Sequence, residues 1–417
     1  MRLLLSTFLL TLCLHASAAE PDAALLAAAR AEQQPLLDSL AEFCAIESNS
    51  KDIAGLRRMA KVLALRLSKL GAVVDWIDPV EKDIYRMEDT PAEPGPIVRA
   101  TFTGKGKRSV LLLAHMDTVY PAGSLARQPF AIRGDRAYGL GILDDKQGLA
   151  VILHTLAILR ARGFDGYGRI TVLFNGDEEI SSPASRALIT KLGSEHDAVL
   201  SFEGTGRDAI SLATAGIAAV NLDVQGRAAH AAAVKGAGVN ALDELAHQIL
   251  QTRKLFANDE GISLAWTEAH AGEARNMLPS EAHAVADVRV RRTADYETVE
   301  ERLRDQVAEQ LLPESRMALR FERRRPPMEA TKASRALAAQ AVNIAKELGI
   351  TLDVITEASG GGTDAAFAAL EAKGPVIESL GLRGAGAHAS QAEYIRLDSI
   401  APRLYMAAKL ILLAAGK

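Results

Sequence analysis

The sequence predicts an α/β protein, in which a doubly wound, mostly parallel sheet is interrupted by an inserted ferredoxin-like α+β domain. Short, wholly apolar segments alternate with helical stretches such as 146–163, which is typical of parallel strands buried on both faces. Between residues 217 and 326 the order of the expected elements changes to βαββαβ, the ferredoxin-like order. With 417 residues, 48% of them apolar, the chain is long enough for two such domains.

The N-terminus has the features of a secretory signal peptide over residues 1–18. Arg2 precedes an apolar run, and the small residues 16–18 follow it as a cleavage site. The run is too short to span a membrane, although an ordinary N-terminal helix is the alternative. We therefore expect a secreted protein without a membrane anchor, in a bacterial-type periplasm. After cleavage Cys44 is the one remaining cysteine, which excludes a disulfide within the mature monomer.

The first domain is predicted from residues 19–216 and 327–417. Two helices are expected within 21–72, the second ended by Gly71, and a short strand at 96–102 follows. The buried strands are expected in the apolar segments 109–117, 168–179, 197–204 and 374–388. The formal net charge is −4 and there is no basic patch or charge block, so no nucleic-acid partner is expected.

The inserted domain is predicted over residues 217–326. Its elements are read from alternating apolar residues for the strands and from helical spacing for the helices. In order they are a strand at 216–226, a helix at 239–256, strands at 263–272 and 281–291, a helix at 295–312 and a strand at 316–324. The chain then returns to the first domain.

Polar residues collect where the predicted parallel strands end. His115 and Asp117 close the first buried segment, Glu178 and Glu179 close the second, and Glu203 closes the third. Ligands bind beyond the carboxyl ends of the strands in such sheets. Crowded carboxylates repel one another, and a divalent cation among them removes that repulsion. Imidazole and carboxylate are ligands that such cations accept.

Two metals that share one carboxylate need about the set of ligands found here. The candidates are His115, Asp144, Glu179, Glu203 and His388. Glu178 is then free to act as the general base, and Asp117 to orient the His115 ring. Each residue alone also fits a hydrogen-bonded structural histidine or a solvated acidic turn, so the residues by themselves leave both interpretations open.

Six segments together resemble the M20 family of dinuclear zinc peptidases, and within it the folate-cleaving glutamate carboxypeptidases of bacteria. They are AHMDTVY, GLGILDDKQG, LFNGDEEI, SFEG, GRAAHAA and GAGAH. The likeness runs from about residue 35 to the C-terminus. It implies two Zn²⁺ ions per subunit, with Glu178 as the general base and a cis peptide after the bridging aspartate. The implied ligands are His115 and Glu203 for one ion, Glu179 and His388 for the other, and Asp144 as the bridge.

The resemblance also implies a homodimer formed through the inserted domain. His230 would reach the active site of the partner subunit and stabilise the oxyanion. Asn276, Arg289, Arg325 and the backbone at Gly362 would bind the substrate, with a guanidinium on its free carboxylate. Which of the three arginines at 323–325 faces the pocket stays open.

The implied activity is hydrolysis of the amide bond to a C-terminal amino acid, with glutamate expected, in acyl, pteroyl or peptidyl substrates. An N-acyl amino acid deacylase or a dipeptidase of the same family is the alternative, and a non-catalytic protein that binds amino-acid derivatives is another. Glu203, rather than aspartate, is typical of the carboxypeptidases and deacylases. Ala209 lies where the glutamate carboxypeptidases carry a lysine, and Arg207 is the candidate to replace that lysine.

Overall fold

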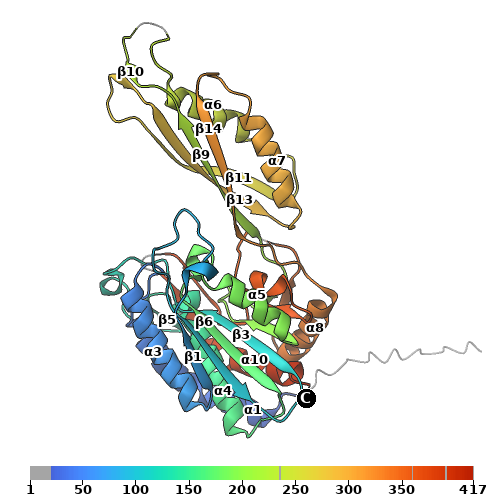
Figure 1. Cartoon of the computed structure of the whole chain (residues 1–417). Coiled ribbons are helices and arrows are strands. Elements are labelled where there is room, and N and C mark those ends of the chain that lie inside the picture. The colour runs from blue at the N-terminus through green and yellow to red at the C-terminus, as the bar shows by residue number, and fades with distance from the viewer. Residues whose placement is uncertain (1–19, 234–235, 359, 390–391, 417) are drawn as a thin grey trace, which may run out of the picture.

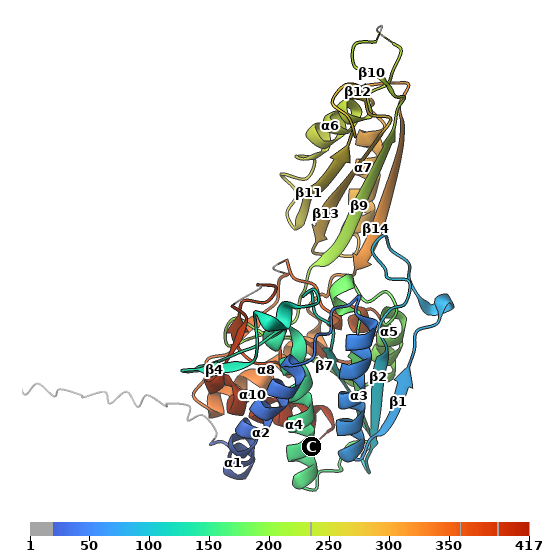
Figure 2. The same cartoon turned by 90° about the vertical axis from the view of Figure 1, so that its left-hand side faces the viewer.

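The computed structural model describes residues 20–233, 236–358, 360–389 and 392–416. The chain forms a lower lobe and an elongated upper lobe that stands on it (Figures 1 and 2). The predicted signal peptide lies outside the described residues, so export stays a prediction. Over the part of the chain that the structure describes, no helix is both long enough and apolar enough to cross a membrane.

The lower lobe is built on a six-stranded sheet with the order β1-β2-β6-β3-β7-β16. The pairs β6–β3, β3–β7 and β7–β16 are parallel, whereas β2 is antiparallel to both β1 and β6. The prediction of a mixed α/β fold with a mostly parallel sheet is confirmed. The strands are β1 (Val73–Ile77), β2 (Ile97–Thr103), β6 (Arg169–Asn175), β3 (Ser109–His115), β7 (Ala198–Ser201) and β16 (Val376–Ile377).

Helices cover both faces of this sheet, as the wholly apolar strands require. Successive side chains of a strand point to opposite faces. In β3, Val110 and Leu112 belong to the core on one face, and Leu111 and Leu113 to the core on the other. The first face packs against α1 (Ala23–Ala31), α2 (Gln33–Cys44), α3 (Ile53–Lys69), α4 (Gln147–Ala161), α8 (Lys332–Glu347) and α10 (Ile400–Ala414). The second packs against α5 (Arg186–Glu195) and α9 (Ala365–Ala369).

Two smaller sheets complete the lower lobe. One has the order β17-β18-β5-β4 and joins the C-terminal part of the chain to the segment before α4. Its strands are β17 (Gly384–Ala385), β18 (Tyr394–Arg396), β5 (Arg136–Tyr138) and β4 (Ala131–Arg133). The other pairs β8 (Ala209–Ser211) with β15 (Asp353–Ile355) in parallel. The single predicted strand at 374–388 is thus two short strands in different sheets.

Five short helical turns lie in the loops of the lower lobe, among the residues that the structure describes. They are η1 (Glu81–Asp83), η2 (Ser124–Ala126), η3 (Ile142–Lys146), η4 (Glu178–Ile180) and η5 (Leu397–Ser399). Of these, η3 directly precedes α4, and η4 follows β6. Both turns therefore lie at the carboxyl-end side of the central sheet, where they present acidic residues.

The upper lobe follows the βαββαβ order. Its antiparallel sheet has the order β11-β13-β9-β14, with both helices contributing to its cores. The elements are β9 (Gly216–Gln225), α6 (Ala241–Thr252), β11 (Ile262–Ala271), β13 (Glu281–Val290), α7 (Asp295–Val307) and β14 (Arg316–Arg325). A two-stranded pairing of β10 (Ala229–His230) with β12 (Met277–Leu278) forms the tip farthest from the lower lobe (Figure 1).

Candidate metal centre and substrate cavity

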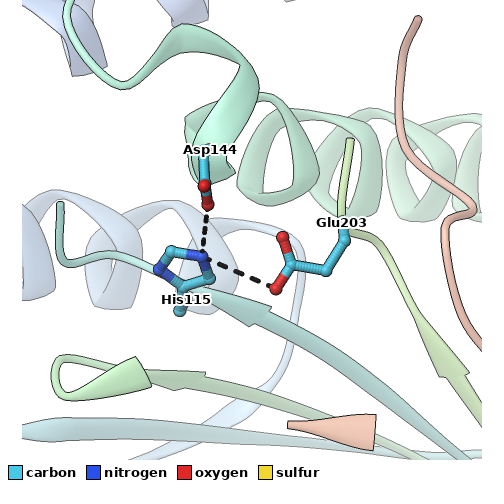
Figure 3. A group of neighbouring side chains, drawn as sticks. All are labelled: His115, Asp144 and Glu203. Carbon is cyan, nitrogen blue, oxygen red and sulfur yellow. Dashed lines mark hydrogen bonds and ion pairs between the residues drawn. The ribbon is translucent and has the colours of Figure 1, made fainter. Parts of the chain in front are cut away.

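His115, Asp144 and Glu203 converge at the carboxyl ends of β3 and β7 (Figure 3). His115 Nε2 lies 2.9 Å from Asp144 Oδ1 and 3.6 Å from Glu203 Oε1. His115 is the last residue of β3, Glu203 follows β7 by two residues, and Asp144 comes from η3. A nitrogen and two carboxylate oxygens at this spacing form a group able to hold one metal ion.

A second group shares Asp144. His388 Nε2 lies 3.1 Å from Asp144 Oδ2 and 3.2 Å from Glu179 Oε2. These three residues also lie close enough to hold a metal ion. The structure thus brings together all five residues named as ligands from the sequence, with one oxygen of Asp144 facing each histidine. A carboxylate placed in this way suits a bridge between two cations.

The charge balance of the two groups fits bound cations. Burial raises the pKa of Glu179 to about 7, with a further rise from Asp144, although the hydrogen bond with His388 opposes it. Burial also raises the pKa of Glu203 to about 7, with His115 opposing the rise. Glu179 Oε1 is buried and has no hydrogen-bond partner among the described residues. Buried carboxylates are stable when paired or bound to metal, so this donor set fits divalent ions, zinc among them.

The turn that carries Asp144 has an unusual backbone. The Asp144–Asp145 peptide is cis, as the family resemblance implied. The preceding Gly141 has a φ of 65°, a conformation that glycine adopts without steric cost. A Cβ at that position would also lie 2.5 Å from Thr118 Cγ2, so a larger residue would not fit there.

Asp117 connects the two strand ends. His115 Nδ1 lies 3.0 Å from the Asp117 backbone oxygen and 3.3 Å from its Oδ1. The carboxylate also accepts hydrogen bonds from the Glu178 N–H at 3.1 Å and from the Glu179 N–H at 3.0 Å. Asp117 is fully buried. It therefore contacts the His115 ring, the residue it is predicted to orient, and it also holds the backbone of the η4 turn, a contact that the sequence did not indicate.

Glu178, the predicted general base, forms an ion pair with Arg325. Its Oε1 lies 2.8 Å from Arg325 Nη1, and its backbone oxygen accepts a hydrogen bond from Arg325 Nη2 at 2.7 Å. Burial raises the pKa of Glu178 well above its ordinary value, although the nearby Arg325 opposes that rise. A buried carboxyl with a raised pKa is suited to general acid–base chemistry.

Arg325 is more deeply held than a substrate ligand at the surface would be. It is 3% exposed, and its Nη1 also donates to Asp364 Oδ1 at 3.1 Å. Asp364 in turn accepts a hydrogen bond from Asn175 at 2.7 Å. Of the Arg325 side-chain nitrogens, only Nε lacks a partner in the described part of the chain. Asp364 was missed in the sequence analysis because an aspartate at a helix start reads as an ordinary cap.

A cavity of about 610 Å³ lies over both groups of candidate ligands, between the two lobes. Arg289, Arg324, Arg325 and Gly362 contribute to its lining together with Asp144, Glu178, Glu179, Glu203 and His388. Gly362 leaves no room for a side chain, since a Cβ there would lie 2.7 Å from Arg325 Cδ. The cavity therefore offers both candidate catalytic groups and guanidinium groups to one bound molecule.

A β-bulge decides which arginines of β14 face the cavity. The register with β9 shifts between Arg323 and Arg325, so the regular alternation of side chains is interrupted. Arg324 and Arg325 both line the cavity, whereas Arg323 pairs with Glu297 of α7 at 3.1 Å on the other face. Arg324 forms an ion pair at 2.7 Å with Asp89 of the β1–β2 loop, which links the two lobes.

His230 and Asn276 are not near the metal groups of their own chain. Both lie at the β10–β12 tip, where the Ala231 N–H donates to the Asn276 oxygen at 2.9 Å. The tip is the end of the upper lobe remote from the lower lobe (Figures 1 and 2). His230 is exposed, and its Nδ1 accepts a hydrogen bond from the Ala232 N–H at 3.1 Å. Any role of these two residues in catalysis requires a second subunit.

Arg207, the candidate to replace the missing lysine, forms an ion pair outside the cavity. Its guanidinium lies 3.4 Å from Asp353 at the surface of the lower lobe. Ala209 is fully buried in β8, which pairs with β15. Neither residue is part of the cavity lining.

Ser39, His154 and Glu32 form a separate hydrogen-bonded series in the lower lobe. Ser39 Oγ lies 2.8 Å from His154 Nε2, and His154 Nδ1 lies 2.6 Å from Glu32 Oε2. The order resembles that of an acyl-transfer triad. Ser39, however, is only 1% exposed, and its hydroxyl also donates to the Pro35 oxygen within the same helix. A substrate cannot reach it, so the series serves to connect α2 with α4.

Comparison with known proteins identifies the family. Residues 111–413 match the family model described as "Peptidase family M20/M25/M40". The chain belongs to the M20 peptidase family. The matched residues include every candidate metal ligand. This M20 protein is therefore a metallopeptidase, a hydrolase that acts on amide bonds.

Relatives of this M20 peptidase have several substrates. It is 42% identical over 405 residues to carboxypeptidase G2 of Pseudomonas sp. (strain RS-16), which covers 96% of this chain and 95% of the relative. It is 28% identical over 342 residues to succinyl-diaminopimelate desuccinylase of Methylobacterium radiotolerans, covering 76% and 85%.

Solved structures confirm the fold. A tripeptidase of Staphylococcus aureus superposes with a TM-score of 0.75 at 20% identity, covering 92% of this chain and 99% of that one. An M20 metallo-carboxypeptidase of Sulfolobus solfataricus superposes with a TM-score of 0.70 at 18% identity, covering 91% and 99%.

Proposed function

We propose that this M20 peptidase is a dizinc carboxypeptidase that releases a C-terminal amino acid, glutamate above all, from acyl, pteroyl or peptidyl substrates. The observation that carries the proposal is the position of Asp144, which presents one carboxylate oxygen to each of two histidine–carboxylate groups. His115 and Glu203 would hold one ion, and Glu179 and His388 the other. The 42% identity to carboxypeptidase G2 supports the choice of substrate class.

The residues of the chain divide the chemistry among them. Two bound zinc ions would polarise the scissile carbonyl and make the attacking water more acidic. Glu178 takes a proton from that water and later delivers it to the leaving amine. Asp117 holds the His115 ring and the η4 backbone in place. The walls of the cavity exclude bulk water, which strengthens the electrostatic interactions within it.

Arg289 is the better placed of the two candidate arginines to meet the free carboxylate of a substrate. Its side chain is 35% exposed toward the cavity, although it is paired with Asp287 at 2.7 Å. Its Nη1 also donates to the Gly360 oxygen at 2.9 Å. Arg325 by contrast is buried and bound to Glu178. We therefore assign Arg289 to the substrate, and Arg325 chiefly to the orientation of Glu178.

A panel of N-acyl amino acids tests the substrate class. The zinc-loaded protein is assayed for amine release while the C-terminal residue is varied, with a pteroyl-glutamate, a succinylated diamino acid and an N-acetyl-citrulline included. Glutamate substrates should exceed neutral ones in kcat/KM by about 10–100-fold, the value of hydrogen bonds to one charged group. Better turnover of the other compounds, with glutamate poor, would move the protein to the deacylase branch and leave the metal chemistry intact. Binding without turnover across the panel would favour the non-catalytic alternative.

We further propose a homodimer in which His230 completes the partner's active site. The position of His230 at the remote tip supports this arrangement, because the residue lies far from the metal groups of its own chain. Replacing His230 with alanine should lower kcat by about 10²–10³-fold, as expected for loss of one oxyanion donor.

Complementation tests the action of His230 across subunits. When His230→Ala and Glu178→Gln chains are expressed together, each mixed dimer has one site with both groups intact. The mixture should then recover about a quarter of the wild-type activity. Activity that stays at the level of the separate variants would contradict a role in the partner's site.

A further inference from the structure

Glu393 is a buried carboxylate next to the metal groups that the sequence analysis did not single out. It is fully buried and directly precedes β18. Its oxygens accept hydrogen bonds from the backbone N–H groups of Gly141 at 3.1 Å, Leu143 at 2.7 Å and Asp144 at 2.9 Å. The Tyr120 hydroxyl donates a fourth, at 2.5 Å. A single side chain thus satisfies three N–H groups of the η3 region.

The fold explains how Glu393 reaches this position. β18 pairs with β5, so that Tyr394 is the partner of Tyr138. This pairing places residue 393 beside the start of the 139–146 segment, which carries Asp144. β18 also pairs with β17, and His388 lies in the connection between those two strands. Glu393 therefore joins two segments, 249 residues apart in the sequence at the Asp144 contact, that must meet to form the Asp144–Glu179–His388 group.

Tyr120 extends the same connection toward His388. Its hydroxyl lies 3.4 Å from the oxygen of Ala389, the residue after His388, while it donates to Glu393. The ring is itself buried, at 5% exposure. One hydroxyl thus touches both the carboxylate that holds the Asp144 turn and the backbone beside the histidine.

Residue 393 has to be a carboxylate because four hydrogen-bond donors point at its side chain. A buried N–H without an acceptor costs about 1–3 kcal/mol. A carboxylate offers two oxygens with about four acceptor positions, whereas a glutamine offers one oxygen and adds two donors. In the glutamine variant at least one N–H of the turn would face another donor. With the amide nitrogen in the Oε2 position the Gly141 N–H loses its acceptor, and with it in the Oε1 position the Leu143 and Asp144 N–H groups lose theirs, so the turn that carries Asp144 is disturbed in either orientation.

We propose that Glu393 is a positioning residue that fixes Asp144 relative to His388, so that the affinity for the metal ion held by Asp144, Glu179 and His388 depends on it. The proposal rests on the two-metal centre proposed above. Residues that orient metal ligands without touching the metal typically contribute about 10–100-fold to metal affinity. Glu393 acts on one ligand through a direct hydrogen bond and on another through the segment that they share.

Stepwise zinc binding to the metal-free protein tests the proposal, measured by competition with a chromophoric chelator. Wild-type protein should bind two ions, and Glu393→Gln should bind one of the two about 10–100-fold less tightly. The cobalt-substituted variant should also show an altered visible absorption spectrum, because the geometry of a ligand has changed. Thermal unfolding of the metal-free forms shows whether the variant is folded.

Glu244→Gln is the matched control. Glu244 is also fully buried and accepts two backbone N–H groups, from Leu311 at 3.3 Å and Leu312 at 2.6 Å, but in the upper lobe. It should lose stability without any change in zinc affinity or in the cobalt spectrum. Equal loss of zinc affinity in both variants would mean that general destabilisation is responsible, and would overturn the positioning role.

The remaining outcomes separate this inference from the proposed function. Wild-type protein that binds no zinc would refute the metal centre itself. Two tightly bound ions in both wild type and Glu393→Gln would keep the centre and refute the role of Glu393. If Glu393→Gln does not fold, Tyr120→Phe replaces it: removal of the Tyr120 hydroxyl should weaken the binding of one of the two ions at least about threefold, a change of the size of one hydrogen bond. Unchanged affinity in that variant would again reject the proposal.

Discussion

Replacing Glu178 with glutamine should lower kcat by about 10²–10⁴-fold, the usual contribution of a general acid–base residue. Glutamine is the right change because it keeps an oxygen for Arg325, which lies 2.8 Å from Glu178 Oε1. Alanine would leave a buried guanidinium with one carboxylate partner fewer, and breaking a buried pair costs about 3–5 kcal/mol in stability. KM should change little, since no ligand to the metal or to the substrate is removed.

Steady-state kinetics on the preferred substrate, together with zinc content, checks this expectation. Glu347→Gln is the matched control, because Glu347 is also a largely buried glutamate in an ion pair, 2.8 Å from Lys409, but lies outside the cavity. That variant should keep wild-type kcat. Full activity in Glu178→Gln protein that retains its metal would show that another group transfers the proton.

Replacing Asp144 with asparagine should weaken the binding of both metal ions, and by at least about 100-fold for each. Removal of a residue that only orients a ligand lowers metal affinity by up to about 100-fold, and removal of a direct ligand should lower it by at least as much. The reason is that Asp144 Oδ1 faces His115 and Oδ2 faces His388. Asparagine replaces one of these oxygens with an N–H₂ group and removes the negative charge that the two groups share.

Metal analysis after dialysis against a chelator, followed by titration with zinc, measures the effect. Asp295→Asn serves as the control, since Asp295 is a buried aspartate that pairs with Arg292 at 2.9 Å in the upper lobe. It should retain two ions. An Asp144→Asn variant that holds both ions as tightly as the wild type would contradict the bridging role.

Much of the candidate site follows from the sequence because parallel strands end at one edge of a sheet. Apolar runs of seven residues or so are recognisable in one dimension, and the polar residues after β3, β6 and β7 must then share that edge. This places His115, Glu179 and Glu203 together without knowledge of any contact. The alternating patterns between 217 and 326 gave the βαββαβ order for a similar reason.

Other features depend on three-dimensional detail that no periodicity carries. The bulge at Arg324 changes which arginine side chains point to the cavity, and a run of three arginines in the sequence gives no sign of a bulge. The hydrogen bonds of Glu393 depend on the pairing of β18 with β5, two strands of three residues each. Strands so short give no alternating signal. The one sign in the sequence that Glu393 is buried was its place between the apolar residues Ala392 and Tyr394.

The junction of the lobes has a consequence for how such proteins are assembled. The chain enters the upper lobe through β9 and leaves it through β14, and Ile217 and Arg325 are direct partners in that antiparallel pair. The two ends of the upper lobe therefore lie about 5 Å apart, the spacing of neighbouring strands. A segment whose two ends adjoin can be inserted, deleted or exchanged by recombination. The lobe that carries the candidate metal ligands then needs almost no change in its own backbone.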